Sequence, residues 1–435
     1  SRASGRFYQI VNARDFSRVP GPKATPTANV HPGFDFSYVA PVSKRFGFTL
    51  SGGHSTQYSP QDIVTLTWRG GGTATNGTTF PHTTFDKPYL STFAVLDGPK
   101  VTARNSLGGT IDFKLTPNDR IALTMQYSSF DVYFRNTTIT FNVGAVAPGN
   151  FSVTSVRGNP GAGDVVLDRA FRHRFNETFM PTLTWRHDGP GWKLDAGAGV
   201  SHGTDENLST SAGFLRTSVA RRAGVTVAFD DIFYLRPRVI TVTDGPTGAR
   251  VDPYNLSSYV LTSGTNAQDG STDVQRSAYA NLQRSFFGRV PVTLKGGLRV
   301  SHGMRDIRSA SPAFTFVGAD GRASTAPAGS DDNAAAFLDA GSSSRTPPYG
   351  LPPMGVVNNN QLLTHYRTNS SHFLWDANAE YRSTVTNSKH AEEVISAGYL
   401  RGDVSFLERR LKFIGGLRAE QTNIEAEGPL TDQTR

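Results

Sequence analysis

The sequence predicts an all-β fold: an antiparallel β-barrel that crosses a membrane with its strands. Three observations predict it. Apolar and polar residues alternate with a period of two over long stretches, which is typical of strands with one apolar and one polar face. Short and long connections alternate between these strands. No run of eighteen apolar residues occurs, which excludes a transmembrane helix but not a barrel, whose strands need only about 10 residues each.

The clearest alternation lies near the C-terminal end, between residues 390 and 422. Apolar residues and glycines occupy every second position from Val394 to Phe406, with Ser396 as the polar exception. After the short turn 407–410 the pattern resumes at residue 411, with Ile414 as the apolar exception on the polar side. Two long strands joined by a tight turn predict an antiparallel hairpin.

Four further hairpins follow the same pattern. Their turns contain Pro, Gly, Asn or Asp, the residues that favour tight turns. The first strand, turn and second strand of each are 34–40, 41–44 and 46–52; 107–115, 116–120 and 121–127; 179–185, 187–191 and 192–200; and 278–286, 288–290 and 292–300.

The stretches between these hairpins are long and rich in Gly, Pro, Ser, Thr, Asn and Asp, and we expect mostly loops there. A soluble sandwich has water at both ends and no reason to alternate short with long connections. A membrane barrel has one, because its short turns face the periplasm and its long loops face outside. The long stretches are 58–100, 136–175, 203–273 and 305–371, with further strands expected at 88–96, 225–233 and 239–243.

The composition of the 435 residues is compatible with this fold. Aromatic residues at 11% and 44 glycines suit a barrel, and would also suit a sandwich. The net charge of +8 is scattered along the chain without a polybasic block, which favours a solvated lumen and rim over a nucleic-acid partner. The absence of cysteine excludes disulfides and thiolate metal sites.

Residues 393–422 resemble a known family. The run from Glu393 to Val404, a short turn, and then Gly415-Gly-Leu-Arg-Ala-Glu-Gln-Thr422 are similar to the barrel of TonB-dependent outer-membrane receptors. In that family a glycine-glycine-aliphatic-arginine-x-glutamate-x-threonine strand follows a short periplasmic turn. The segments 34–68, 97–135, 181–202, 272–308 and 372–392 also resemble barrel segments of this family.

The resemblance implies an outer-membrane barrel of about 22 strands that takes up a scarce solute such as a siderophore, vitamin or oligosaccharide. Its implied partners are outer-membrane lipid and lipopolysaccharide, the solute, and a periplasmic TonB protein that contacts segments outside this chain. Residues 1–435 show no plug-like segment, so we expect a barrel segment without the plug and the C-terminal strands. The alternatives are a passive porin-like channel and a soluble carbohydrate-binding β-sandwich.

Five charged residues are expected to face the lumen by strand parity. The resemblance implies that they line a channel or contact the plug; the alternative is a solvated ladder of ion pairs between strands. They are Arg299, Arg401, Asp403, Arg418 and Glu420.

Two loops carry clusters of aromatic residues, which can stack on sugars or flat ligands or pack together to hold a loop in shape. The candidate ligand contacts are Phe80, Phe85, Tyr89, Phe314, Phe316 and Tyr349, with Phe93 and Phe337 beside them.

Nothing in the sequence predicts an enzyme, a cofactor or a metal site. The ten histidines show no metal-ligand spacing, and neither a nucleophile elbow nor a phosphate-binding loop occurs. Oxygen ligands between Asp320 and Asn333 could suit calcium, but the EF-hand spacing is absent and turn formation is the simpler interpretation. The glycines at 197–199 and 296–297 lie mid-strand, as close-packing positions.

Overall fold

The computed structural model describes residues 1–11, 30–70, 83–84, 86–234, 236–408 and 410–428. It confirms the all-β prediction: 65% of the residues are in strands, which form an antiparallel sheet, and 10% are in helices. Within the described chain the sheet is not closed into a barrel. All five predicted hairpins are present. No helix in the described residues is long and apolar enough to span a membrane.

Eleven long strands of the described chain form a sheet that we call the wall. Each pairs with the next wall strand in sequence, so the wall is a meander interrupted only by insertions. Its members are β1 (Arg2–Val11), β2 (Val30–Pro41), β3 (Phe46–Tyr58), β6 (Lys100–Lys114), β7 (Asp119–Asn142), β9 (Gly163–Asp188), β10 (Trp192–Leu208), β14 (Gln268–Phe286), β15 (Val292–Ala310), β18 (Lys389–Phe406) and β19 (Leu411–Glu427).

The insertions build a second sheet, the outer sheet, at the long-connection end of the wall. The far parts of β7 and β9 continue into it, so these two strands belong to both sheets. Its order is β4 (Gln61–Arg69), β5 (Tyr89–Gly98), β7, β9, β11 (Thr217–Phe233), β13 (Val260–Thr265), β16 (Ala313–Phe316) and β17 (Phe373–Trp375). The strands β8 (Val156–Arg157) and β12 (Arg236–Asp244) pair with the far end of β11.

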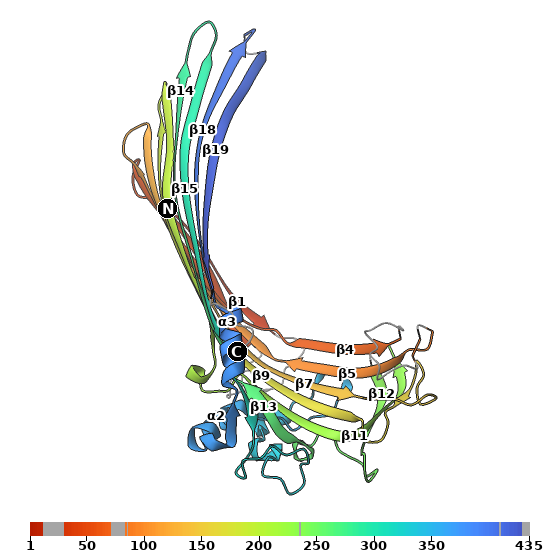
Figure 1. Cartoon of the computed structure of the whole chain (residues 1–435). Helices are drawn as coiled ribbons and strands as arrows, with labels where there is room; N and C mark the ends of the chain where they lie inside the picture. The colour runs from red at the N-terminus through yellow and green to blue at the C-terminus, as the bar shows by residue number, and fades with distance from the viewer. Residues whose placement is uncertain (12–29, 71–82, 85, 235, 409, 429–435) are drawn as a thin grey trace.

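Figure 1 shows the two sheets meeting at a sharp bend, so that the chain has the shape of an L. The helix α2 (Asn359–Thr368) and neighbouring segments lie on the side of the outer sheet away from the wall, and α3 (Ala377–Asn387) lies at the bend against β15. We call the outer sheet and the segments that cover it the outer module. Its shorter helices are η2 (Thr210–Ala212), η3 (Leu256–Ser258), η4 (Ala334–Phe337), α1 (Ala340–Ser343), η5 (Pro348–Gly350) and η6 (Ser370–His372).

The hydrophobic core lies in the outer module. It forms because one face of the outer sheet alternates apolar residues and the segments after β16 cover that face. Its fully buried members include Leu90, Phe93, Ile139, Phe141, Leu215, Phe229, Tyr259, Leu261, Phe316 and Leu362.

The structure corrects the extent of the predicted loops. The strand candidates at 88–96, 225–233 and 239–243 are confirmed within β5, β11 and β12, and the wall strands themselves extend well into the stretches expected to be loops. The prediction of barrel strand across 372–392 is wrong for 377–387, which is α3. The Asp376 carboxylate caps this helix by accepting a hydrogen bond from the Ala379 amide at 2.8 Å.

Candidate functional site: the polar inner angle and its anchored module

Cross-strand pairing sorts the wall residues into two faces, because directly opposed residues share a face. Leu298, Ala280, Ala196 and Trp185 are paired in turn across β15, β14, β10 and β9. One position along, the paired row is Gly297, Asn281, Asp195 and Arg186. One face of the wall is therefore apolar and the other polar.

The apolar face of the wall is open. On β15 its apolar positions run without a break from Val292 to Val300, about 26 Å of strand at about 3.3 Å per residue. A polar row begins beyond it, where His54 Nδ1 lies 2.7 Å from Asn105 Oδ1. Large side chains exposed on this face by 40% or more include Leu50, Leu107, Ile111, Phe113, Met125, Phe179, Leu183, Trp185, Leu282, Leu298, Val300, Leu400, Phe413 and Leu417.

The strand β7 runs from the wall into the outer module, so alternate residues along it stay on the same face in both sheets. Met125 lies on the apolar face of the wall, and Ile139 and Phe141, at even spacings along the same strand, are buried in the module core. The segments that cover this core lie away from the wall (Figure 1). The polar faces of the two sheets therefore line the inside of the L, which we call the inner angle.

On the outer sheet, the inner angle is lined by half-buried hydroxyl, amide and carboxylate groups. Thr92 Oγ1 donates to Asn142 Oδ1 at 3.0 Å, and Asn142 Nδ2 donates to Asp164 Oδ1 at 2.6 Å. Thr138 and Asp168 are paired beside them. Burial raises the pKa of Asp168 above its ordinary value. Such neutral and acidic groups can hydrogen-bond a polar solute.

The five predicted lumen residues share the polar face of β15, β18 and β19. Arg401 Nε lies 2.7 Å from Asp403 Oδ1, whose carboxylate also pairs with Lys412 at 3.0 Å, and Arg418 pairs with Glu420. Of these contacts only Lys412–Asp403 joins two strands; the other two lie within one strand, so a ladder of ion pairs between strands stays a prediction. Contact with a plug stays a prediction.

The glycines of the wall make room for tyrosines on this polar face. A Cβ on Gly297 would lie 2.6 Å from the ring of Tyr399 and 2.4 Å from Asn281 Oδ1. The Tyr399 hydroxyl donates to Asn281 Oδ1 at 2.8 Å. The predicted close-packing role of this glycine is confirmed.

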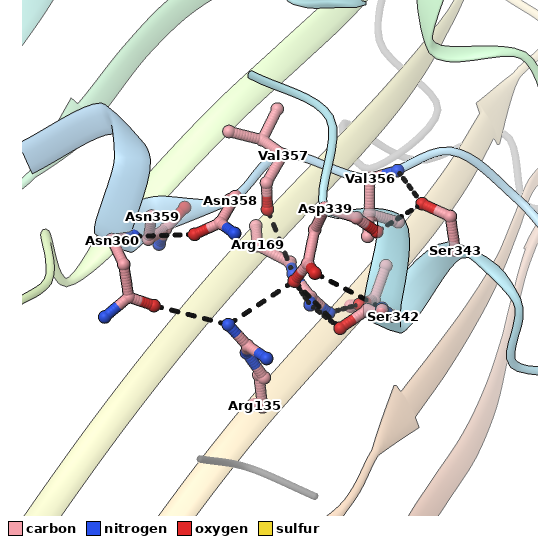
Figure 2. Close-up of polar contacts among 12 residues, drawn as sticks. Arg135, Arg169, Asp339, Ser342, Ser343, Val356, Val357, Asn358, Asn359 and Asn360 are labelled. Carbon is pink, nitrogen blue, oxygen red and sulfur yellow. Dashed lines mark hydrogen bonds and ion pairs between the residues drawn. The ribbon is translucent and has the colours of Figure 1, made fainter. Parts of the chain in front are cut away.

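A buried ion cluster anchors the covering segments to the outer sheet. Figure 2 shows Arg135 of β7 and Arg169 of β9 converging on Asp339, at 3.4 Å and 3.0 Å. Arg169 also donates to Ser342 Oγ at 2.7 Å and to the Val357 carbonyl at 3.3 Å. The three charged side chains are at most 6% exposed. The segment 339–357 is therefore fixed to two strands that run on into the wall.

Electrostatics keep this cluster charged near neutral pH. Burial alone would raise the pKa of Asp339, but Arg135, Arg169 and the bonds from Ser342 outweigh it and hold that pKa below its ordinary value. Burial and the neighbouring Arg135 lower the pKa of Arg169 to about 10. A carboxylate and two guanidinium groups are therefore present together.

A second anchor lies beside the first. Arg345 Nε donates to Asp97 Oδ2 at 2.8 Å, and Arg345 Nη1 donates to the Tyr58 hydroxyl at 3.1 Å. Asp97 is on β5 and Tyr58 is the last residue of β3. The covering segments are thus tied to both sheets at the bend.

The described aromatic candidates lie in or against the module core and not in the inner angle. Tyr89, Phe314 and Phe316 are buried in the module core, and Tyr349 is half-buried against it, its hydroxyl donating to the Asp62 carbonyl at 3.3 Å. Phe80 and Phe85 lie outside the described residues. Packing explains the buried rings; a ligand-contact role stays a prediction, which their burial disfavours.

The described residues contain no group of three His, Asp or Glu side chains arranged to hold a metal ion. In the candidate calcium loop, Asp331 Oδ2 accepts from the Ala319 and Asp320 amides at 2.5 Å and 3.0 Å, which is the turn-forming role. His365 Nε2 lies 3.0 Å from His372 Nδ1 in the module.

Sequence reasoning missed the anchoring residues Arg135, Arg169 and Asp339. Arg135 and Arg169 fall on the apolar parity of strands that continue with Ile139, Phe141 and Leu167 toward the core. The available signal was an arginine at an apolar position of an alternating strand. Such a position predicts a buried charge, and a buried charge needs an oppositely charged partner.

No protein-family model matches the chain, and no curated protein matches it. Function is therefore inferred from the residues and geometry of this chain.

Proposed function

We propose that this chain forms part of the wall and the outer module of a β-barrel receptor in the cell outer membrane. The receptor takes up a scarce solute, such as a siderophore, vitamin or oligosaccharide, by TonB-coupled transport. The observation that carries the proposal is the two-faced wall, which is apolar and uncovered on one side and has the long insertions of the described chain at one end. The resemblance of residues 393–422 to TonB-dependent receptors supports the choice among barrels.

The open apolar face supports a lipid environment. Leaving a Leu or Phe side chain in water instead of burying it forfeits about 1.5–3 kcal/mol, and this face repeats that loss over many side chains. The apolar stretch Val292–Val300 on β15 has nine residues, which matches the length of about 9–11 residues that a tilted transmembrane strand needs. Lipid would bury the whole face at once.

Further strands are part of the proposal. Within the described residues β1 pairs only with β2, and β19 only with β18. An unpaired backbone group in lipid costs several kcal/mol, so additional strands would join these two edges. In a barrel of about 22 strands, this wall would be half of the circumference.

The outer module would capture the solute and the polar face would receive it. The inner angle faces the interior of such a barrel, and its Thr, Asn and Asp side chains suit a polar ligand. TonB coupling and a plug would act through segments outside this chain. The passive channel is the second candidate, because the ion pairs on the polar face also suit a water-filled pore.

Two measurements test the proposal in the protein that carries this chain. The first is flotation of isolated membranes together with protease access to the outer module in intact cells. Flotation with exposed insertions is expected; a detergent-free, monodisperse protein would contradict the membrane assignment.

The second measurement is solute uptake with and without TonB and with the proton gradient dissipated. Energised transport requires both. Uptake that persists without either would favour the passive channel.

A further inference from the structure

Four basic residues lie side by side on the polar face of the wall, near its short-turn end. Arg120 of β7 is paired with Lys114 of β6 on one side and with Arg186 of β9 on the other. The Lys114 amide donates to the Arg45 carbonyl at 2.7 Å, which brings Arg45 into line at the start of β3. We call these four residues the basic row.

The basic row is electrostatically unfavourable by itself, because like charges directly opposed across strands destabilise a sheet. Asp112 relieves it in part, accepting from Arg120 Nε and Nη2 at 2.9 Å and 2.7 Å. Arg186 has acidic neighbours as well, because Asp195 is its partner across β9 and β10 and Asp188 lies two positions along on the same face. Arg45 and Lys114 form no salt bridge with any described residue. Around the row, five basic side chains stand beside three acidic ones, and this excess of cations suits an anionic partner.

Elsewhere on the same polar face, acidic side chains do neutralise the cations. On β18 and β19, Arg401 and Lys412 share Asp403, and Arg418 pairs with Glu420. The cations there neutralise acids on the same face. Lys295 and Arg299 of β15 add further cations to the same face, but in the described chain only the basic row has cations at one register position across the adjacent strands from β3 to β9.

The shape at the basic row favours an extended partner over a small anion. The row borders an open recess of about 420 Å³ between the turns 42–45 and 115–118. Its four cations are exposed and span three strand spacings, about 14 Å. A small anion needs donors that converge in an enclosed site, whereas carboxylates spaced along a peptide match a line of separate cations.

We propose that the basic row docks an acidic peptide segment that reaches the wall from the short-turn end. In an extended segment the side chains of one face repeat about every 6.6–7 Å, so two or three carboxylates can reach the row. The peptide replaces the missing anions and removes the repulsion. Only the compartment of the partner, the periplasm, rests on the proposed function.

The test measures peptide binding to the detergent-solubilised parent protein. The probe is a fluorescein-labelled peptide of alternating Glu and Ser, with a Gln–Ser peptide of equal length as control, followed by fluorescence anisotropy. Wild type is expected to bind only the acidic peptide, with an affinity that falls as salt rises.

Two double variants locate the site. Lys114→Gln with Arg186→Gln is expected to weaken binding by about tenfold, as two exposed ion pairs are lost. Lys295→Gln with Arg299→Gln removes the same charge from the same face and is expected to change binding by less than about twofold. Because repulsion is relieved, the first variant should melt no lower than wild type, and its β-rich circular dichroism should be retained.

Each other outcome overturns the inference. These are no binding of the acidic peptide to wild type, an equal loss in both double variants, or tighter binding of tripolyphosphate that displaces the peptide. A protein that floats with membranes but binds no peptide contradicts this inference alone. One that binds the peptide but does not float contradicts the membrane assignment alone.

Discussion

The wall and the outer module share two strands, yet they treat apolar residues in opposite ways. On β7, Met125 is 44% exposed on the wall, whereas Phe141, on the same side of the same strand, is fully buried in the module. The module carries its own core, and the wall does not. The comparison teaches that alternation specifies which side of a strand is apolar, and the surroundings decide what covers it.

The largest expected effect contrasts the charges of the two regions. Asp339→Ala leaves Arg135 and Arg169 buried without a carboxylate, and breaking a buried pair in this way costs about 3–5 kcal/mol. Glu420→Ala removes half of an exposed pair on the wall and should cost at most about 1 kcal/mol. Hydrogen-exchange protection of the module amides measures the first change, and chemical unfolding compares both. Equal costs would show that the anchor is not energetically distinct.

The next prediction tests which side of the wall meets lipid. Leu298→Arg should destabilise the parent protein by about 2–4 kcal/mol if this side lies at the bilayer midplane, whereas Arg299→Leu should be mild. The two positions are adjacent, so depth is nearly matched and orientation varies. Folded protein at the cell surface is the readout. If both variants reached the cell surface equally well, the assignment of the lipid-facing side would be wrong. If Arg299→Leu were the more damaging change, the polar face would be the one that meets lipid.

A smaller effect is expected where the wall itself is tightly packed. Gly297→Ala forces a methyl group against Asn281 and Tyr399, and overpacking of this kind costs about 1–3 kcal/mol. Gly415→Ala is the matched control, because no atom lies within 4 Å of the added carbon. Unfolding midpoints in detergent compare the two. A control as damaging as Gly297→Ala would point to backbone effects instead of ring packing.

The smallest effect concerns pH and belongs to the module. Burial, together with the neighbouring His372, lowers the pKa of His365 below 6.5. The native module therefore keeps this imidazole neutral while the unfolded chain gains a proton, and stability falls as pH drops from about 6.5 to the lowered native pKa. Hydrogen-exchange protection of the module amides should decrease as the pH is lowered from 7.5 to 5. In His365→Gln this protection should depend less on pH. An unchanged slope in that variant would exclude His365 as the source.

The wall could be predicted from the sequence because its signals are local. The hairpin turns and the period of two depend on neighbouring residues, and all five hairpins follow them. The shared face of the five charged residues followed from parity alone, given the pairing of β15, β18 and β19. The expected ion pairs between strands did not anticipate that Arg401 and Arg418 pair with acids two positions along their own strands.

The outer module could not be predicted in the same way. Its core joins residues far apart in sequence, and the Arg169–Asp339 contact spans 170 positions. A local signal was also missed, because Asp376 caps the helix α3 in a stretch expected to be strand. The basic row needed the register of four strands, which composition and spacing do not contain.

Two of the insertions leave the wall and rejoin it across a single pair of residues on neighbouring strands. Tyr58 pairs with Val101, and the Ser59 amide donates to the Lys100 carbonyl at 2.8 Å, so the wall closes beneath the residues between them. Ile307 and Lys389 bracket another insertion in the same manner. In evolutionary terms, a lineage can lengthen, shorten or exchange these segments while the wall inherits its register unchanged. The outer end of the molecule can therefore change while the pairing of the wall strands stays the same.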